Sequence, residues 1–163
     1  MKHAKRGWAA VLVAGLLLVV SPPSYGEKTP SENASALSRA LLGVETPEAV
    51  ADLMRKKFLF VEDCELFRLE DYWQSPEELW DRKAGDCEDF ALFAQYALQR
   101  QGLKSQVISI YASNGYAHTV VIFERDGSYY AINEDRLYRY GALTLEEALS
   151  KVCPFWTWAS VAE

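Results

Sequence analysis

The stretch Ala84-Gly85-Asp86-Cys87-Glu88-Asp89-Phe90-Ala91 places a cysteine at the start of a predicted helix. Asp86 can cap this helix, and Glu88 and Asp89 fall in its first turn, where acidic side chains complement the helix dipole. Gly102 is a natural stop. One apolar face follows at helical spacing, formed by Phe90, Ala91, Ala94, Ala97 and Leu98. The sequence therefore predicts a helix of about 15 residues, an ordinary globular length, whose first turn carries a thiol.

Three predicted strands follow this helix, at residues 106–111, 117–124 and 129–133. Asp126-Gly127, between the last two, is a strong two-residue hairpin signal. Such a hairpin pairs Arg125 with Ser128. Counting outward places Asn133 opposite Val120 and Asp135 opposite His118, with all four side chains on one face of the sheet.

The remaining elements are mostly short helices. A first helix is expected at residues 36–43, a second at 47–57 after the cap Thr46, and a third at 76–82 after the cap Ser75. Thr144 opens a final short helix, and residues 153–158 form an apolar tail expected to pack on the domain. Helices followed by an antiparallel sheet predict an α+β fold.

The N-terminus has the pattern of a secretory signal peptide over residues 1–26. A basic start precedes an apolar run at residues 9–20, and small residues end the segment at Ser24-Tyr25-Gly26. The apolar run is shorter than the roughly 20 residues of a membrane-spanning helix, which argues against an uncleaved anchor. We therefore expect an exported protein, periplasmic or extracellular, with no membrane span after cleavage. Residues 27–35 are predicted to be a flexible lead-in and residues 36–163 a single domain.

Charge and cysteine content narrow the function classes. The chain has 17 basic and 23 acidic residues, and loss of Lys2, Lys5 and Arg6 with the signal peptide changes the formal charge from −6 to −9. An acidic chain is a poor nucleic-acid binder, because phosphate contacts need Lys and Arg.

Three cysteines in an exported chain suggest one disulfide and one free thiol. If Cys87 is free, Cys64 and Cys153 are the candidate pair; the alternative is three separate thiols.

Cys87 and His118 are the candidate reactive pair. Once residues 1–26 are removed, His118 is the only histidine, and so the only ordinary base that titrates near neutral pH. The helix start lowers the pKa of a thiol, whereas Asp86, Glu88 and Asp89 oppose thiolate formation unless they point away or are neutralised. Either Asn133 or Asp135 can orient the imidazole from the same sheet face. One thiol and one imidazole fall short of the four ligands of a structural zinc site.

Gly-Asp-Cys-Glu-Asp-Phe-Ala, a histidine on a strand and Ala-Ile-Asn after a tight hairpin resemble the transglutaminase-like superfamily of papain-fold cysteine enzymes. In particular they resemble the bacterial transglutaminase-like cysteine proteinases, over residues 72–137. The resemblance implies a central catalytic helix packed on a small antiparallel sheet, with Cys87 as nucleophile and His118 as base. It favours Asn133 as the third residue, with Asp135 as a rival. The oxyanion hole would use the Cys87 N–H and an upstream side chain, for which the candidates are Trp73, Gln74 and Trp80.

The implied function is hydrolysis or acyl transfer at amide bonds of a protein or peptide, through a thioester on Cys87. No cofactor is expected, except that some periplasmic relatives bind calcium at positions matched by Asp86 and Glu88. Calcium prefers roughly 6–8 oxygen ligands, so two acids alone do not make a site. The alternative function is a non-catalytic transglutaminase-like binding domain of the cell envelope, with tryptophans lining a recognition surface.

Overall fold

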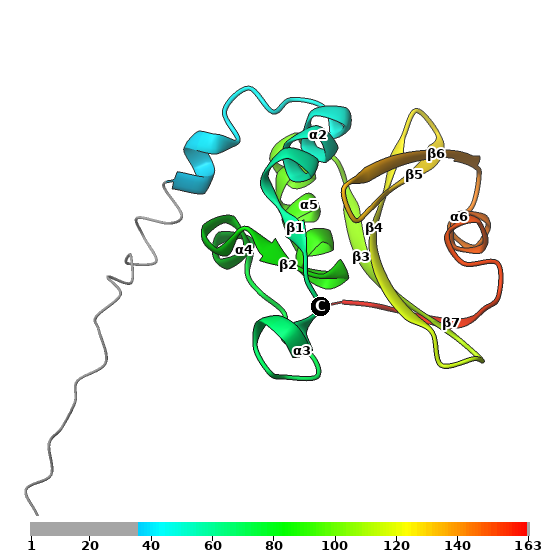
Figure 1. The fold of residues 1–163 in the computed structure, drawn as a ribbon. Coiled ribbons are helices and arrows are strands. Elements are labelled where there is room, and N and C mark those ends of the chain that lie inside the picture. Colours follow the sequence, from blue (N-terminus) through cyan, green and yellow to red (C-terminus); the bar gives the residue numbers. More distant parts are fainter. Residues whose placement is uncertain (1–35, 163) are drawn as a thin grey trace, which may run out of the picture.

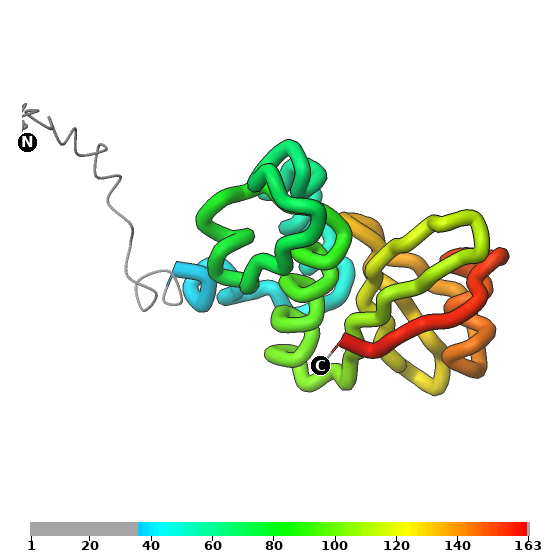
Figure 2. The backbone as a smooth tube through the Cα atoms, turned by 90° about the horizontal axis from the view of Figure 1, so that it is seen from below, coloured from blue at the N-terminus to red at the C-terminus, as the bar shows by residue number. Residues whose placement is uncertain are grey.

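The computed structural model describes residues 36–162 and shows an α+β fold, as the sequence predicts (Figure 1). The predicted signal peptide and lead-in lie outside these residues. No helix within residues 36–162 is long and apolar enough to cross a membrane. Helical elements occupy the first half of the described chain and a sheet most of the second. The two halves lie side by side in both views (Figures 1 and 2).

The first half contains short helices joined by a two-stranded parallel ladder. Residues 36–40 are helical, and the elements that follow are α2 (Pro47–Lys57), β1 (Leu59–Phe60), α3 (Asp63–Leu66), α4 (Pro76–Arg82), β2 (Ala84–Gly85) and α5 (Cys87–Arg100). The predicted caps are present: Thr46 accepts from the N–H of Ala49, and Ser75 forms a capping box with Glu78. Asp86 caps α5 in a box with Asp89. Local cap chemistry therefore fixes where each of these helices begins.

The second half forms a five-stranded antiparallel sheet in the order β6-β5-β4-β3-β7. Its elements are β3 (Ser105–Ala112), β4 (Ala117–Arg125), β5 (Ser128–Asn133), β6 (Arg136–Ala142), α6 (Leu145–Val152) and β7 (Trp156–Val161). The β4–β5 pairing runs from Arg125↔Ser128 to Val121↔Ile132, which confirms the predicted hairpin register.

Two strands of the five-stranded sheet were not predicted from the sequence, and neither were the short strands β1 and β2. β6 mixes arginines and tyrosines on an edge strand that is largely exposed, so it lacks the apolar alternation of a half-buried strand. The expected apolar tail is instead the start of β7, the opposite edge, which pairs with β3 from Ile108↔Val161 to Ala112↔Trp156. A strand whose partner lies some 50 residues away is defined by tertiary pairing and not by its local pattern.

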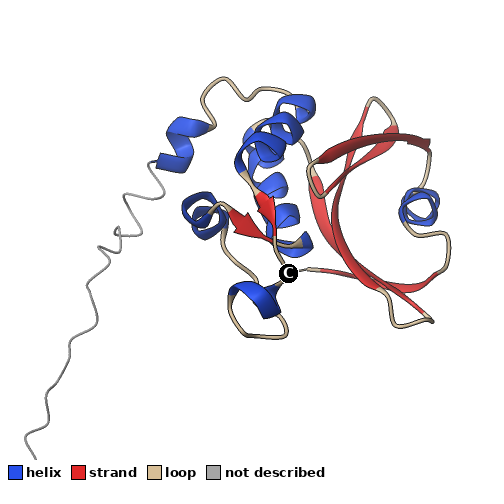
Figure 3. Ribbon diagram, viewed as in Figure 1, coloured by secondary structure: helices blue, strands red, loops and turns tan. Residues whose placement is uncertain are grey.

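The sheet has a different helix on each face. Val107, Val121, Phe123 and Ile132 join the core formed with α5, whereas Ile108, Ile110, Val120 and Ile122 join the core formed with α6. Figure 3 shows the sheet curving around α6, with α5 against its outer face. The N-terminus of α5 therefore meets the sheet near the start of β4.

All three cysteines are free thiols in the structure. Cys64 is exposed on α3, and Cys153 is buried at the C-terminal cap of α6. Figure 1 places α3 and α6 on different sides of the molecule. The structure therefore supports three separate thiols, the alternative to a Cys64–Cys153 bridge.

Candidate active site

Cys87 and His118 line the same cleft, at the seam between the helical half and the sheet. The cleft has a volume of about 370 Å³. One wall comes from the α5 entrance and the chain before it, and the other from β3 and β4; the lining residues are Glu62, Glu70, Asp71, Trp73, Asp86, Cys87, Glu88, Ser109, Tyr111, Ala117, His118 and Thr119. A larger hollow of about 530 Å³ at the other end of α5 has neither a thiol nor an imidazole in its lining.

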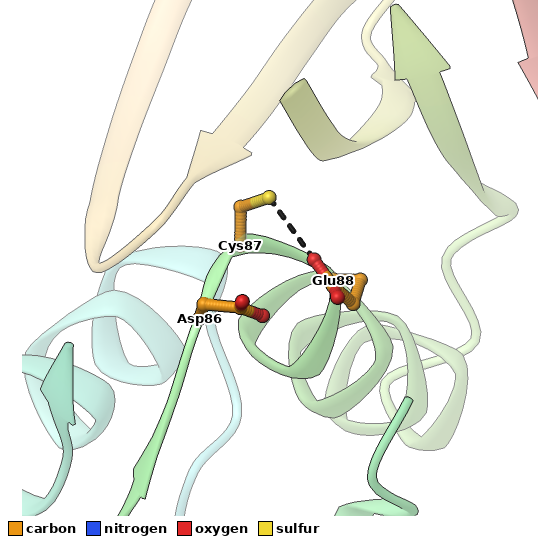
Figure 4. A group of neighbouring side chains, drawn as sticks. All are labelled: Asp86, Cys87 and Glu88. Atoms are coloured by element: carbon orange, nitrogen blue, oxygen red, sulfur yellow. Dashed lines mark hydrogen bonds between the residues drawn. The ribbon is translucent and has the colours of Figure 1, made fainter. Parts of the chain in front are cut away.

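Cys87 is the first residue of α5 and is partly exposed. Its thiol donates to Oε2 of Glu88, with 3.1 Å between sulfur and oxygen, and Figure 4 shows the two groups turned toward each other. Burial raises the pKa of the Cys87 thiol, and its hydrogen bonds with Glu88 and with the Thr119 backbone only partly oppose this. In this arrangement the thiol holds its proton, and Thr119, the neighbour of His118, lies against the sulfur.

The acids beside Cys87 are buried. Burial raises the pKa of Asp86 to about 8, helped by a hydrogen bond and the charge of Glu88. Burial also raises the pKa of Glu88, and the contact with Cys87 adds to the shift. Burial therefore favours the neutral form of both carboxyl groups. The sequence predicts that these acids oppose formation of a Cys87 thiolate. A neutral carboxyl group repels the thiolate less than a charged one does, so burial reduces this opposition.

The sheet wall pairs His118 with Asn133. Nε2 of His118 lies 2.7 Å from Oδ1 of Asn133, the last residue of β5. The imidazole thus reaches diagonally to the amide, one of the two contacts that the register allows. Asp135 lies in the turn after β5, and its carboxylate is 3.8 Å from Nε of Arg136. Of the two candidate partners, the His118 imidazole therefore contacts Asn133, whereas Asp135 faces Arg136. The catalytic roles of Cys87, His118 and Asn133 stay predictions.

Of the three candidate oxyanion donors, only Trp73 lines the cleft. Its indole N–H donates to Oδ1 of Asp71 at 3.1 Å. Gln74 is fully buried, and its side-chain amide donates to Asp89 and to the carbonyl of Ala84. Trp80 packs in the aromatic core against Phe58. Tertiary packing therefore favours Trp73 among the three candidates that the sequence leaves open.

A group of carboxylates surrounds the α5 entrance. Asp63, Asp71 and Glu88 each offer an oxygen, and these atoms lie within 4.8 Å of one another; Asp63, Asp86 and Asp89 form a second such set. Oδ1 of Asp63 and Oδ1 of Asp86 are buried without a hydrogen-bond partner. Sequence reasoning missed Asp63, since it lies far upstream on a four-residue helix and nothing local indicates that it is buried.

Comparisons with known proteins identify the family of the chain. The sequence profile of the bacterial transglutaminase-like cysteine proteinases (BTLCP) matches residues 29–135. The chain belongs to this family. It is therefore a cysteine peptidase with a transglutaminase-like domain, and its family's substrates are proteins. No match was found among curated proteins.

Solved structures share the fold. Legionella pneumophila LapG has a TM-score of 0.55 and 18% identity, covering 84% of this chain and 78% of LapG. Its calcium-bound form has a TM-score of 0.54 and 18% identity, covering 80% and 74%. A TGase crystal structure has a TM-score of 0.50 and 12% identity, covering 69% of this chain and 34% of the TGase. At these identities the likeness establishes the common fold alone.

Proposed function

We propose that this chain is an exported cysteine peptidase that cleaves amide bonds of proteins through a thioester on Cys87. The observation that carries the proposal is the shared cleft, in which Cys87 faces a sheet wall where His118 is hydrogen-bonded to Asn133. A nucleophile, a base and a group that orients the base are the parts of a Cys-His-Asn mechanism. Residues 36–163 are proposed to be the catalytic domain, released from a signal peptide at residues 1–26.

The first proposed step is transfer of the thiol proton to His118. With Nε2 donating to Oδ1 of Asn133, Nδ1 is the nitrogen left to accept that proton. The thiol now contacts Glu88, so the step includes rotation of the Cys87 side chain away from Glu88 toward the imidazole. The ion pair then offsets part of the burial that raises the pKa of the thiol.

The thiolate then attacks the scissile carbonyl. A sulfur–carbon bond forms, and the carbonyl oxygen becomes an oxyanion that the Cys87 N–H can bind. The Trp73 indole N–H joins it by leaving Oδ1 of Asp71, to which it donates before the substrate binds. His118 protonates the leaving amine as the carbon–nitrogen bond breaks, which leaves a thioester. Water, deprotonated by His118, hydrolyses the thioester and restores the thiol. Attack by an amine in place of water would give transamidation at the same thioester.

Calcium fits the carboxylates at the α5 entrance. Asp63, Asp86 and Glu88 are buried, two of their oxygens have no partner, and no lysine or arginine lines the cleft beside them. Hard oxygen donors of this kind suit calcium, and Legionella pneumophila LapG is known in a calcium-bound form. A bound calcium would neutralise these carboxylates and hold the α5 entrance to the preceding chain. This proposal extends the two ligands suggested by the sequence, Asp86 and Glu88, with Asp63.

The proposal can be tested with a thiol-directed probe on the mature protein. We expect Cys87 to react with iodoacetamide faster than a free cysteine does, and faster than it reacts in His118→Ala. Protein fragments from the producing cell's envelope, compared with and without Cys87→Ser, then identify substrates. Equal labelling in the wild-type and His118→Ala proteins contradicts the nucleophile assignment. A binding partner retained by Cys87→Ser, with no fragment lost, would favour the non-catalytic alternative.

A further inference from the structure

We infer that Asp89 and Gln74 form a clamp that positions Trp73 beside Cys87, so that Asp89 acts on catalysis without touching the substrate. The inference rests on the proposed function, in which the Trp73 indole N–H binds the oxyanion. Asp89 and Gln74 are both fully buried, and neither lines the cleft. Their effect on the site must therefore pass through the residues they hold.

Asp89 is bound by donors from two separate segments. Oδ1 accepts from the backbone N–H of Gln74 at 2.7 Å. Oδ2 accepts from Nε2 of Gln74 at 2.5 Å and from the backbone N–H of Asp86 at 3.2 Å. One carboxylate thus caps the entrance of α5 and also ties that entrance to the chain around Trp73. Charge-assisted bonds of this kind are the stronger class of hydrogen bond.

Gln74 uses its whole side-chain amide inside the protein. Nε2 also donates to the carbonyl of Ala84 at 3.0 Å, and Oε1 accepts from Nε of Arg82 at 3.1 Å. These bonds join Gln74 to the end of α4 and to β2, the strand that leads directly into Cys87. The position of residue 74 relative to the nucleophile is therefore fixed by several bonds and does not depend on one.

Trp73 itself lies in a segment without helix or strand, between α3 and α4. Its two neighbours donate their backbone N–H groups to buried carboxylates: Tyr72 to Asp63 and Gln74 to Asp89. Trp73 is 38% exposed and lines the cleft. The two carboxylates are thus what fixes the backbone on either side of the proposed oxyanion donor.

Gly85 shows how closely the clamp is packed against the helix entrance. A Cβ at this position would lie 2.2 Å from Oδ2 of Asp89 and 2.7 Å from Nε2 of Gln74. The glycine is required here by close approach and not by its backbone angles, because its φ is not in the left-handed region. Gly85, at the end of β2, is therefore part of the clamp.

Two small probes separate positioning from general loss of structure. With p-nitrophenyl acetate, the Cys87 sulfur bonds to the carbonyl carbon, an oxyanion forms, and p-nitrophenolate leaves. With iodoacetamide, the sulfur displaces iodide from carbon and no oxyanion forms. The ratio of acylation rate to alkylation rate therefore reports the oxyanion hole. The exposed thiol of Cys64 is removed by Cys64→Ser in every variant.

In Asp89→Asn the new amide nitrogen cannot accept the hydrogen bonds from Gln74 Nε2 and the Asp86 N–H. We therefore expect the ratio of acylation to alkylation to fall by about tenfold, while the alkylation rate changes by less than about twofold.

Trp73→Phe should lower the ratio at least as much. Because Asp89 acts through Trp73, adding Asp89→Asn to Trp73→Phe should lower the ratio by less than about twofold more. Leu149→Ala, in the core on the α6 side, is the control and should leave the ratio unchanged.

A wild-type ratio in Asp89→Asn, or equal loss of both rates, would overturn the inference. If Asp89→Asn does not fold, Gln74→Met supplies the test: it removes only the side-chain donor and should lower the ratio about threefold. An unchanged ratio in folded Gln74→Met also overturns the inference. If wild type reacts with neither probe faster than Cys87→Ser, the proposed function itself is wrong.

Discussion

The two walls of the cleft are held in place by different kinds of interaction. The sheet wall carries His118 and Asn133, which are placed by hairpin register and held by one hydrogen bond of 2.7 Å. The helix wall carries Cys87, which is placed by buried carboxylates that bond to chain 15 residues away, as Asp89 does to Gln74. Both contacts span 15 residues, but the first wall is a repetitive hairpin ladder, whereas the second is a buried polar network that binds a segment without helix or strand.

This difference indicates which wall of the site is more sensitive to substitution. A two-residue turn and strand alternation fix the register of β4 and β5 over many pairs, so no single side chain decides it. At the helix wall, each buried carboxylate is satisfied by only a few donors, and losing one leaves an uncompensated polar group in a low dielectric. We therefore expect substitutions at the helix wall to affect both folding and activity, and those at the sheet wall to affect mainly activity.

The largest expected effect comes from removing either reactive group. Cys87→Ser and His118→Ala should each lower peptidase turnover by roughly 10³-fold or more, because nucleophile and base act as a unit. Pooled fluorogenic peptides provide the assay. The double variant should be no slower than the slower single variant. Independent, additive losses would contradict a Cys87–His118 pair.

A smaller effect is expected at the sheet wall from Asn133→Ala, which leaves the imidazole without its orienting partner. Turnover should fall by roughly 10–100-fold while the melting temperature stays close to wild type. Asp135→Ala is the matched control, because Asp135 lies only two residues after Asn133 and its carboxylate faces Arg136. A greater loss in Asp135→Ala than in Asn133→Ala would reverse the assignment.

At the helix wall, Gly85→Ala should destabilise the protein by roughly 1–3 kcal/mol, since the added Cβ meets Asp89 and Gln74. Urea unfolding followed by circular dichroism measures the change. Gly141→Ala on the sheet side is the control: its Cβ would meet nothing within 4 Å, and only the φ of +61° resists the substitution. Equal destabilisation by the two substitutions would show that the packing around Gly85 is not tight.

The smallest expected effect is stabilisation by calcium. At about ten times its Kd, calcium should add about 1.4 kcal/mol to the free energy of unfolding. Asp63→Asn should abolish the resulting shift in melting temperature, and EGTA should do the same in wild type. The control Glu124→Gln, an exposed acid on β4, should keep the shift. A shift retained in Asp63→Asn would remove this residue from the proposed calcium site.

Much of the fold followed from local patterns. The caps Thr46, Ser75 and Asp86 marked helix starts, because a side chain that accepts from the first turn acts within a few residues. Asp126-Gly127 fixed the β4–β5 register for the same reason. The edge strands β6 and β7 escaped prediction, because the largely exposed β6 lacks an apolar alternation and β7 pairs with β3, which lies far away in the chain.

The sequence by itself determined the identity of the candidate nucleophile and base. Cys87 is the cysteine at a helix start, and His118 is the only histidine after residues 1–26. Hairpin counting reduced the third residue to Asn133 or Asp135. Tertiary structure then brought Trp73 to the cleft, buried Gln74 against Asp89, and added Asp63 to the acidic group. These features depend on contacts between segments far apart in the chain, and a pattern read along one strand or helix does not contain them.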